Sequence, residues 1–117
     1  MEKPASTRQL KVAREIQKAL AEIIRSKGMS AMGGALVTVS EVRVSPDLSV
    51  AKVWVSIFPI GGAKKEDVMT AIQDNTSDLR RRLGLRVGKQ LRIIPQLTFF
   101  LDDSLDYIEK IDTLLKQ

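Results

Sequence analysis

Six positively charged side chains and no carboxylate lie between Leu79 and Arg92. They are Arg80, Arg81, Arg82, Arg86, Lys89 and Arg92. Guanidinium groups suit phosphate because their planar fork donates two parallel hydrogen bonds, whereas a lysine ammonium acts as a compact point charge. Cations gathered this closely repel one another unless a polyanion meets them. The tract therefore predicts a surface that binds nucleic acid or an anionic membrane.

The other charges show that this tract is unusual within the chain. The formal net charge is +5, and the excess lies in the tract and in residues 1–35, since residues 36–78 and 101–117 are both net acidic. A solvated helix end is the plain alternative, because Asp78 can pair with Arg82 at a spacing of four residues. That single carboxylate leaves most of the six charges unmatched, so we favour contact with RNA phosphates.

A second, weaker group of cations lies near the N-terminus, where Arg8 and Lys11 fall off the apolar stripe of an expected helix. A solvated helix face explains them nearly as well as RNA contact does, because Glu15 and Glu22 dilute the positive field. We therefore place Arg8 and Lys11 second among the candidate RNA-binding residues.

The composition excludes several kinds of chemistry. The chain contains no cysteine and no histidine, which removes disulfides, thiolate chemistry, the usual zinc ligands and histidine acid–base catalysis. Asp102 and Asp103 are adjacent at a strand end and point to opposite faces, so they cannot easily share a proton or a metal ion. The glycine pairs at 33–34 and 61–62 lack the lysine of a phosphate-binding loop. We expect no catalytic residue, no metal and no cofactor.

The chain also lacks an apolar run behind its N-terminus and any stretch of roughly 20 apolar residues. Neither a secretory signal nor a membrane span is expected, and the missing cysteines fit a reducing compartment. The sequence predicts a cytoplasmic monomer with one domain over residues 6–117, preceded by a flexible tail over residues 1–5.

Hydrophobic periodicity predicts the order helix, strand, strand, helix, helix, strand, helix. Apolar residues at spacings of three and four give a first helix that ends at Gly28, and Ser6 with Gln9 resembles its capping box. Two strands are expected at residues 36–45 and 49–58, a second helix at 64 to about 74, and a third helix after Thr76 or Ser77 with Leu79, Leu83 and Val87 on one face. A last strand is expected at 96–102, followed by a helix after Ser104. This order favours an α+β fold in which helices cover one face of a three-stranded sheet.

Two interruptions of this pattern carry structural information. Val37 and Val44 fall on opposite faces of the first strand, and a β-bulge near Ser40-Glu41 would bring them to one face. Asn75-Thr76-Ser77 are poor helix formers and good caps, so the chain is expected to stop and restart there. Thr76 or Ser77 would then be the N-cap of the third helix.

Trp54 alternates with Val53 and Val55 on its strand and therefore faces away from them. It could stack on a base, or it could fill a groove against a neighbouring strand or the last helix. We favour the second interpretation, because an isolated tryptophan most often buries area. The few aromatic residues of the chain also argue against a platform for many unpaired bases.

Several stretches resemble the ribosome-binding factor A family. They are Val12-Ala13 within Arg8 to Ile24, Val39 to Leu48, Ala51 to Val55, Arg92 to Phe100, Asp103-Ser104-Leu105 and Ile111 to Leu115. The most specific part is Arg-Ile-x-Pro-x-Leu-x-Phe, which begins at Arg92. The resemblance implies the type II K-homology fold, α-β-β-α-kink-α-β with a C-terminal helix. Family members usually carry Ala-x-Gly at the kink, where this chain has Asn75-Thr76-Ser77.

The same resemblance implies a non-catalytic factor that binds the immature small ribosomal subunit and contacts its rRNA. It further implies help with late rRNA maturation, support of growth in the cold, and release with the aid of an assembly GTPase. No small-molecule substrate and no membrane partner is expected. From the residues alone, a basic protein-interaction module that binds an acidic protein remains the alternative. An enzyme ranks last, because the sequence indicates no pocket lined by convergent polar side chains.

Overall fold

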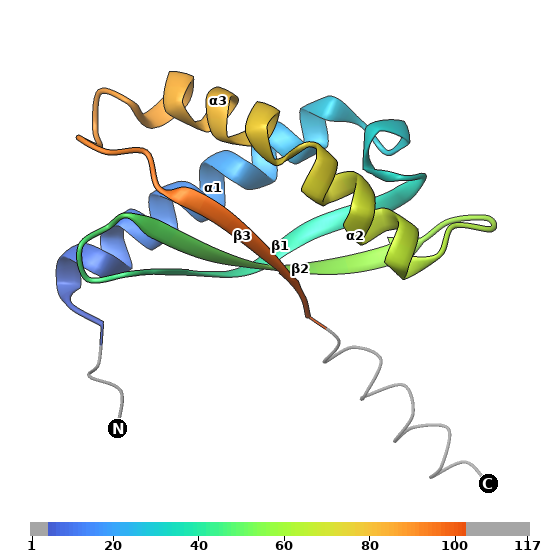
Figure 1. The fold of residues 1–117 in the computed structure, drawn as a ribbon, viewed down its shortest axis with the longest axis horizontal. Helices are drawn as coiled ribbons and strands as arrows, with labels where there is room; N and C mark the ends of the chain where they lie inside the picture. Colours follow the sequence, from blue (N-terminus) through green and yellow to red (C-terminus); the bar gives the residue numbers. More distant parts are fainter. Residues whose placement is uncertain (1–4, 103–117) are drawn as a thin grey trace, which may run out of the picture.

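The computed structural model describes residues 5–102, so residues 1–4 and the helix expected after Ser104 lie outside the described residues. The elements are α1 (Thr7–Lys27), a short 3-10 helix η1 (Ser30–Met32), β1 (Ala35–Val44), β2 (Val50–Pro59), α2 (Lys65–Asp74), α3 (Thr76–Val87) and β3 (Gln96–Leu101). Helices and strands follow one another in the predicted order. The helices lie on one side of the sheet, which confirms the expected α+β fold (Figure 1).

The sheet has the order β1-β2-β3, with β1 antiparallel and β3 parallel to the central strand. The predicted bulge is confirmed, because Val39 pairs with Val55 and Glu41 with Trp54, which leaves Ser40 as the extra residue. The bulge changes the parity of β1, so valines on either side of it face the same core. The buried valines of β1 are Val37, Val42 and Val44.

Helix α1 begins at the predicted capping box. The Oγ of Ser6 accepts a hydrogen bond from the Gln9 N–H at 3.1 Å, and the Oε1 of Gln9 accepts one from the Ser6 N–H at 2.8 Å. The Nε2 of Gln9 also donates to the Val44 carbonyl at 3.0 Å, which ties the start of α1 to the end of β1. The helix ends at Gly28, whose φ of 84° favours glycine.

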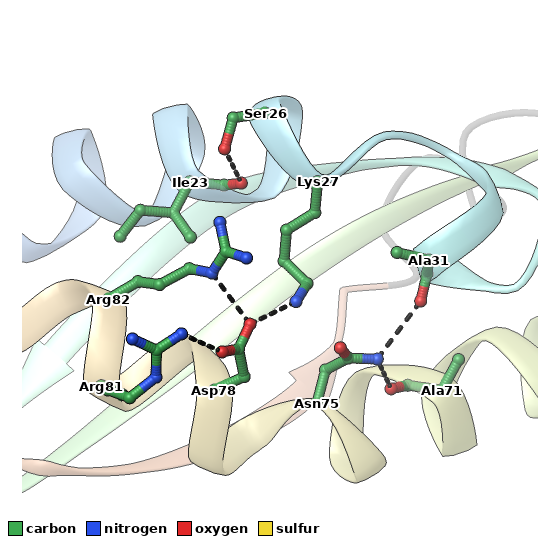
Figure 2. Close-up of polar contacts among 9 residues, drawn as sticks. All are labelled: Ile23, Ser26, Lys27, Ala31, Ala71, Asn75, Asp78, Arg81 and Arg82. Carbon is green, nitrogen blue, oxygen red and sulfur yellow. Dashed lines mark hydrogen bonds and ion pairs between the residues drawn. The ribbon is translucent and has the colours of Figure 1, made fainter.

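The break between α2 and α3 occurs at Asn75, as expected, but it is not made by a hydroxyl cap. Neither Thr76 nor Ser77 caps α3, so that prediction is wrong. The Oγ1 of Thr76 instead donates to the Ile72 carbonyl at 3.2 Å. The Asn75 amide nitrogen donates to the Ala71 carbonyl at 2.8 Å and to the Ala31 carbonyl at 3.2 Å (Figure 2). The kink is therefore fixed by a tertiary contact to η1, which local capping rules do not detect.

Replacing Asn75 should show how much this contact stabilises the kink. Asn75→Ala should lower the free energy of unfolding by about 1 kcal/mol, because two carbonyls lose a donor. Asn75→Asp should cost more, since it places carboxylate oxygens against both carbonyls. Urea unfolding measures both changes. The control is Ser77→Ala, which should change stability by less than about 0.5 kcal/mol; a loss of about 1 kcal/mol there would restore Ser77 as the cap.

Candidate nucleic-acid interface

Four of the predicted RNA-binding residues project from α3 and two from the loop that follows it. Leu79, Leu83 and Val87 are buried along one side of α3, as expected. Because these positions face the core, the arginines between them must lie on the sides and outer surface of the helix. Arg80, Arg81, Arg82 and Arg86 occupy these positions, and Lys89 and Arg92 follow in the exposed loop.

Asp78 lies among three cations at the start of α3 (Figure 2). Its Oδ1 accepts from the Nη2 of Arg81 at 2.7 Å, and its Oδ2 accepts from the Nε of Arg82 at 2.9 Å. The ammonium of Lys27, at the end of α1, donates to the same Oδ2. The predicted pair of Asp78 with Arg82, four residues apart, is confirmed. The contact of Asp78 with Lys27 was not predicted. The Lys27 side chain is only 10% exposed, so this contact joins α1 to α3 at a largely buried position.

The cations around Asp78 hold its pKa well below its usual range. The largest cause is the hydrogen bond from Lys27, followed by the one from Arg81, with Arg82 adding to both. The carboxylate therefore stays ionised at any physiological pH. One negative charge shared by three positive ones leaves this cluster with a net positive charge.

Arg80 and Arg86 are also held by the fold, each in a different way. Arg80 donates to two backbone carbonyls, from its Nε to Pro95 at 3.1 Å and from its Nη2 to Ile94 at 2.8 Å. These acceptors are neutral, so the charge of Arg80 is not cancelled. Arg86 forms an ion pair with Glu22 of α1. The expectation that Asp78 alone opposes the tract is therefore wrong, because the packing of α1 against α3 brings in Glu22.

Lys89 and Arg92 differ from the four helical arginines. Both are exposed, and within residues 5–102 neither side chain has a hydrogen bond or ion pair. We call the six predicted cations together with Lys27 the α3 surface. It carries seven cations, of which Lys27 is largely buried, and among residues 5–102 two carboxylates, Asp78 and Glu22, pair with them, so it remains strongly positive.

Arg8 and Lys11 lie in the first turns of α1 and are exposed. Lys11 lines a shallow pocket with Thr7, Leu10, Arg14 and Glu15, all from α1, and no residue of the α3 surface takes part in it. The start of α1 and the loop after α3 lie toward the same end of the molecule, at the left of Figure 1. The structure thus brings the two groups to one end without joining them in one site.

Other kinds of site are not found in the part of the chain that the structure describes. No cluster of three or more acidic side chains there could hold a metal ion. None of the helices between residues 5 and 102 is long and apolar enough to cross a bilayer.

A three-stranded sheet with α1 and a kinked α2–α3 pair on one face defines a type II K-homology-like domain, here with a basic third helix. The sequence identifies the family within this fold. The model of the family described as Ribosome-binding factor A matches residues 8–115, and the chain belongs to that family. It is 41% identical over 112 residues to the Ribosome-binding factor A of Cytophaga hutchinsonii, covering 96% of this chain and 83% of that one. It is 46% identical over 114 residues to that of Flavobacterium johnsoniae, covering 94% and 84%.

Solved structures agree with this assignment. The crystal structure of ribosome-binding factor A from Thermus thermophilus is similar with a TM-score of 0.66 and 28% identity, covering 80% of this chain and 94% of that one. A homology model of the Thermus thermophilus protein, fitted into a cryo-electron microscopy map of a 30S complex, gives a TM-score of 0.61 and 28% identity over 78% and 91%. The predicted family and its fold are thereby confirmed.

The shifted pKa of Asp78 predicts how the variant Asp78→Asn should respond to pH. In the unfolded chain Asp78 binds its proton near its ordinary pKa of 3.8, whereas in the folded protein it resists protonation. The unfolded state therefore gains protons first as the pH falls, and the stability that Asp78 contributes is lost progressively as the pH falls from about 4 toward the much lower pKa of the folded state. Asp78→Asn should be less stable than the unaltered protein near neutral pH, and the gap should narrow on acidification.

Urea unfolding of both proteins at about pH 6 and about pH 3 measures this gap. Asp74→Asn is the matched control for the loss of one negative charge, because Asp74 is exposed and has no recorded partner within residues 5–102. A gap between Asp78→Asn and the unaltered protein that is the same at both pH values would contradict the assigned role of Asp78.

Proposed function

We propose that this chain is a non-catalytic assembly factor that binds the immature small ribosomal subunit through the phosphates of its rRNA. Binding would assist late rRNA maturation and support growth in the cold. The observation that carries the proposal is the α3 surface, where seven cations face two carboxylates in a chain of this family. The related Thermus thermophilus protein has been fitted into a map of a 30S complex, which supports the same partner here.

The two kinds of cation on the α3 surface would contribute differently. Arg81 and Arg82 are already oriented by Asp78, so they lose less side-chain freedom when a phosphate arrives. Lys89 and Arg92 have no internal partner among the described residues to give up, so their charges are fully available. Affinity would come mainly from release of counterions, and selectivity from the shape of A-form RNA, whose deep groove hides the base edges. Arg8 and Lys11 would add a second phosphate contact at the same end of the molecule.

No covalent step is involved in this proposal. The protein would favour one conformation of the rRNA because it binds that conformation more tightly than the others. It would act as a cytoplasmic monomer and leave the particle with the help of an assembly GTPase.

A second candidate function is a module that binds an acidic protein. It is favoured by Leu85 and Ile93, which are 77% and 58% exposed and lie on α3 and in the loop beside the cations. Both functions predict salt-sensitive binding, so salt alone cannot separate them. Treatment of the isolated complex with RNase can: RNA binding predicts release of the protein, and a protein partner predicts retention.

Neutralising the two unpaired cations tests the proposed function most directly. Lys89→Gln/Arg92→Gln should reduce co-sedimentation with immature small subunits on a density gradient and leave the urea unfolding midpoint unchanged. If about six phosphates are neutralised, log affinity should fall against log salt with a slope of roughly −4 to −5. The double variant should lower the size of that slope by about 2, or one for each lost phosphate contact.

The matched control is Lys18→Gln/Lys64→Gln, which removes the same charge from exposed positions outside the α3 surface. It should sediment like the unaltered protein. Equal loss of binding in both double variants would mean that only net charge matters, and a slope near zero would rule out phosphate binding by this surface.

A further inference from the structure

The face of the sheet opposite the helices carries a row of side chains that the α3 surface does not use. Trp54 of β2 stacks on Phe100 of β3, with ring centroids 5.2 Å apart and ring planes 25° apart. Arg43 of β1 lies over the Trp54 ring, with its Cζ 5.6 Å from the centroid. We call these three residues the aromatic row. It agrees with the favoured interpretation that Trp54 packs against a neighbouring strand, and it spans all three strands.

The aromatic row lies on a face that no helix among residues 5–102 covers. Val53, Val55 and Phe99 are buried, so the alternating positions of Trp54 and Phe100 face away from the core. The described helices all lie on the other side of the sheet (Figure 1). Phe100 remains 37% exposed and Trp54 is half-buried. Stacked aromatic rings that stay partly exposed on a sheet face can serve as an interaction site.

A second row of polar side chains lies beside the first. Lys52 of β2 is the register partner of both Arg43 of β1 and Thr98 of β3, and all three are exposed. Lys52 and Thr98 lie two residues before Trp54 and Phe100, which is a shift of roughly 7 Å along the strands. Glu41 pairs with Arg43 at 2.9 Å, so Lys52 is the main source of positive charge in this row. Its ammonium can bind phosphate, and the Thr98 hydroxyl can donate or accept a hydrogen bond.

We propose that this face, which no helix among residues 5–102 covers, binds single-stranded RNA. One or two bases would stack against the aromatic row, and an adjoining phosphate would meet Lys52. Bases in a duplex stack on one another and hide their faces, so only unpaired nucleotides can use such a surface. Stacking tolerates any base, so the face would recognise an unpaired strand rather than a particular sequence.

This inference rests on the proposed function and extends it to a second surface. Arg92 lies in the loop that leads into β3, and the first residue of β3, Gln96, donates from its N–H to the Ser49 carbonyl at 2.9 Å. The loop cations of the α3 surface and the polar row therefore lie toward the same end of the sheet. RNA whose paired segment lies on the α3 surface can continue onto the sheet face as a single strand.

Another occupant of this face is the chain itself, because a net acidic segment with apolar residues at helical spacing follows Asp102. Its apolar side chains could meet the aromatic row, and its carboxylates could meet Lys52. A nucleotide strand uses both rows, since bases meet the rings while phosphates meet the cation. RNA is favoured because the polar row lies at the same end of the sheet as the cations of the loop before β3.

Trp54 is the only tryptophan in the chain, so its fluorescence reports on this face alone. We would titrate the full-length protein with a single-stranded uridine oligonucleotide of about ten residues and with a blunt RNA duplex of the same length. The single strand should quench Trp54 emission and the duplex should not. Phe100→Leu should weaken the affinity for the single strand about tenfold. Lys52→Gln should lower the salt slope by about 0.7, the loss of one phosphate on a single strand.

Phe58→Leu is the matched control, because Phe58 is an exposed phenylalanine of β2 on the same face that lies outside the aromatic row. It should bind the single strand like the unaltered protein. An equal loss in both leucine variants, or no quenching by the single strand, would overturn the inference. A red shift of Trp54 emission in full-length Ile111→Asp without RNA, with no response of the unaltered protein to RNA, would assign the face to the chain's own C-terminal segment and also overturn it.

Lys89→Gln/Arg92→Gln separates this inference from the proposed function. That double variant should lose small-subunit binding and keep the quenching by the single strand. Phe100→Leu should instead weaken the quenching more than it weakens small-subunit binding. If Lys89→Gln/Arg92→Gln abolished the quenching, the oligonucleotide would be binding at the α3 surface, and the sheet face would be excluded. If quenching survived while every variant bound small subunits equally, the proposed function would fail and the single-strand site would stand.

Discussion

One carboxylate links the third helix to the first and orients the cations around it. The Asp78 carboxylate pairs with Lys27 of α1 and with Arg81 and Arg82 of its own helix. The same group therefore attracts α1 to α3 and reduces the repulsion among the three cations. The pair between Arg86 and Glu22 fastens the same two helices further along. Exposed ion pairs such as those of Arg81 and Arg82 stabilise a fold only slightly. Their larger effect is on the orientation of the arginine side chains, because they hold the guanidinium groups in set positions. The surface nevertheless keeps its excess of positive charge.

The second surface follows from the topology of the sheet. Parallel pairing of β2 with β3 requires a crossover connection, and α2 with α3 supplies it. That crossover places both helices on the face that α1 already covers, which leaves the other face without a helix among residues 5–102 (Figure 1). The same connection that positions the basic helix therefore exposes Trp54 and Phe100. Polar side chains would suffice for a sheet face that only meets water, yet two of the side chains there are stacked aromatic rings.

Local spacing predicted much of this structure, and contacts between distant residues account for the rest. The capping box at Ser6, the bulge at Ser40 and the pair of Asp78 with Arg82 all depend on residues within a few positions, so their patterns are visible in the sequence. Asn75 was expected at the kink, but its bond to Ala31 spans 44 positions, and the sequence suggested a hydroxyl cap instead. Glu22 and Lys27 escaped notice for the same reason, since they meet α3 across 64 and 51 positions. The face of Trp54 was predictable from alternation, whereas its partner Phe100 depends on the crossover.

A factor that only binds can change the course of RNA folding if it contacts one conformation better than another. Moving an equilibrium from 1:99 to 99:1 takes about 5.5 kcal/mol of differential binding. Phosphate contacts distinguish conformations only by where each one places its phosphates, and they do not read the bases. One or two stacked bases, at about 1–3 kcal/mol each, would be gained only by a conformation that presents unpaired nucleotides beside its paired segment. A sheet with a basic helix on one side and an aromatic row on the other would meet that geometric requirement. The ion pair of Asp78 with Lys27 would keep α3 rigidly placed against α1.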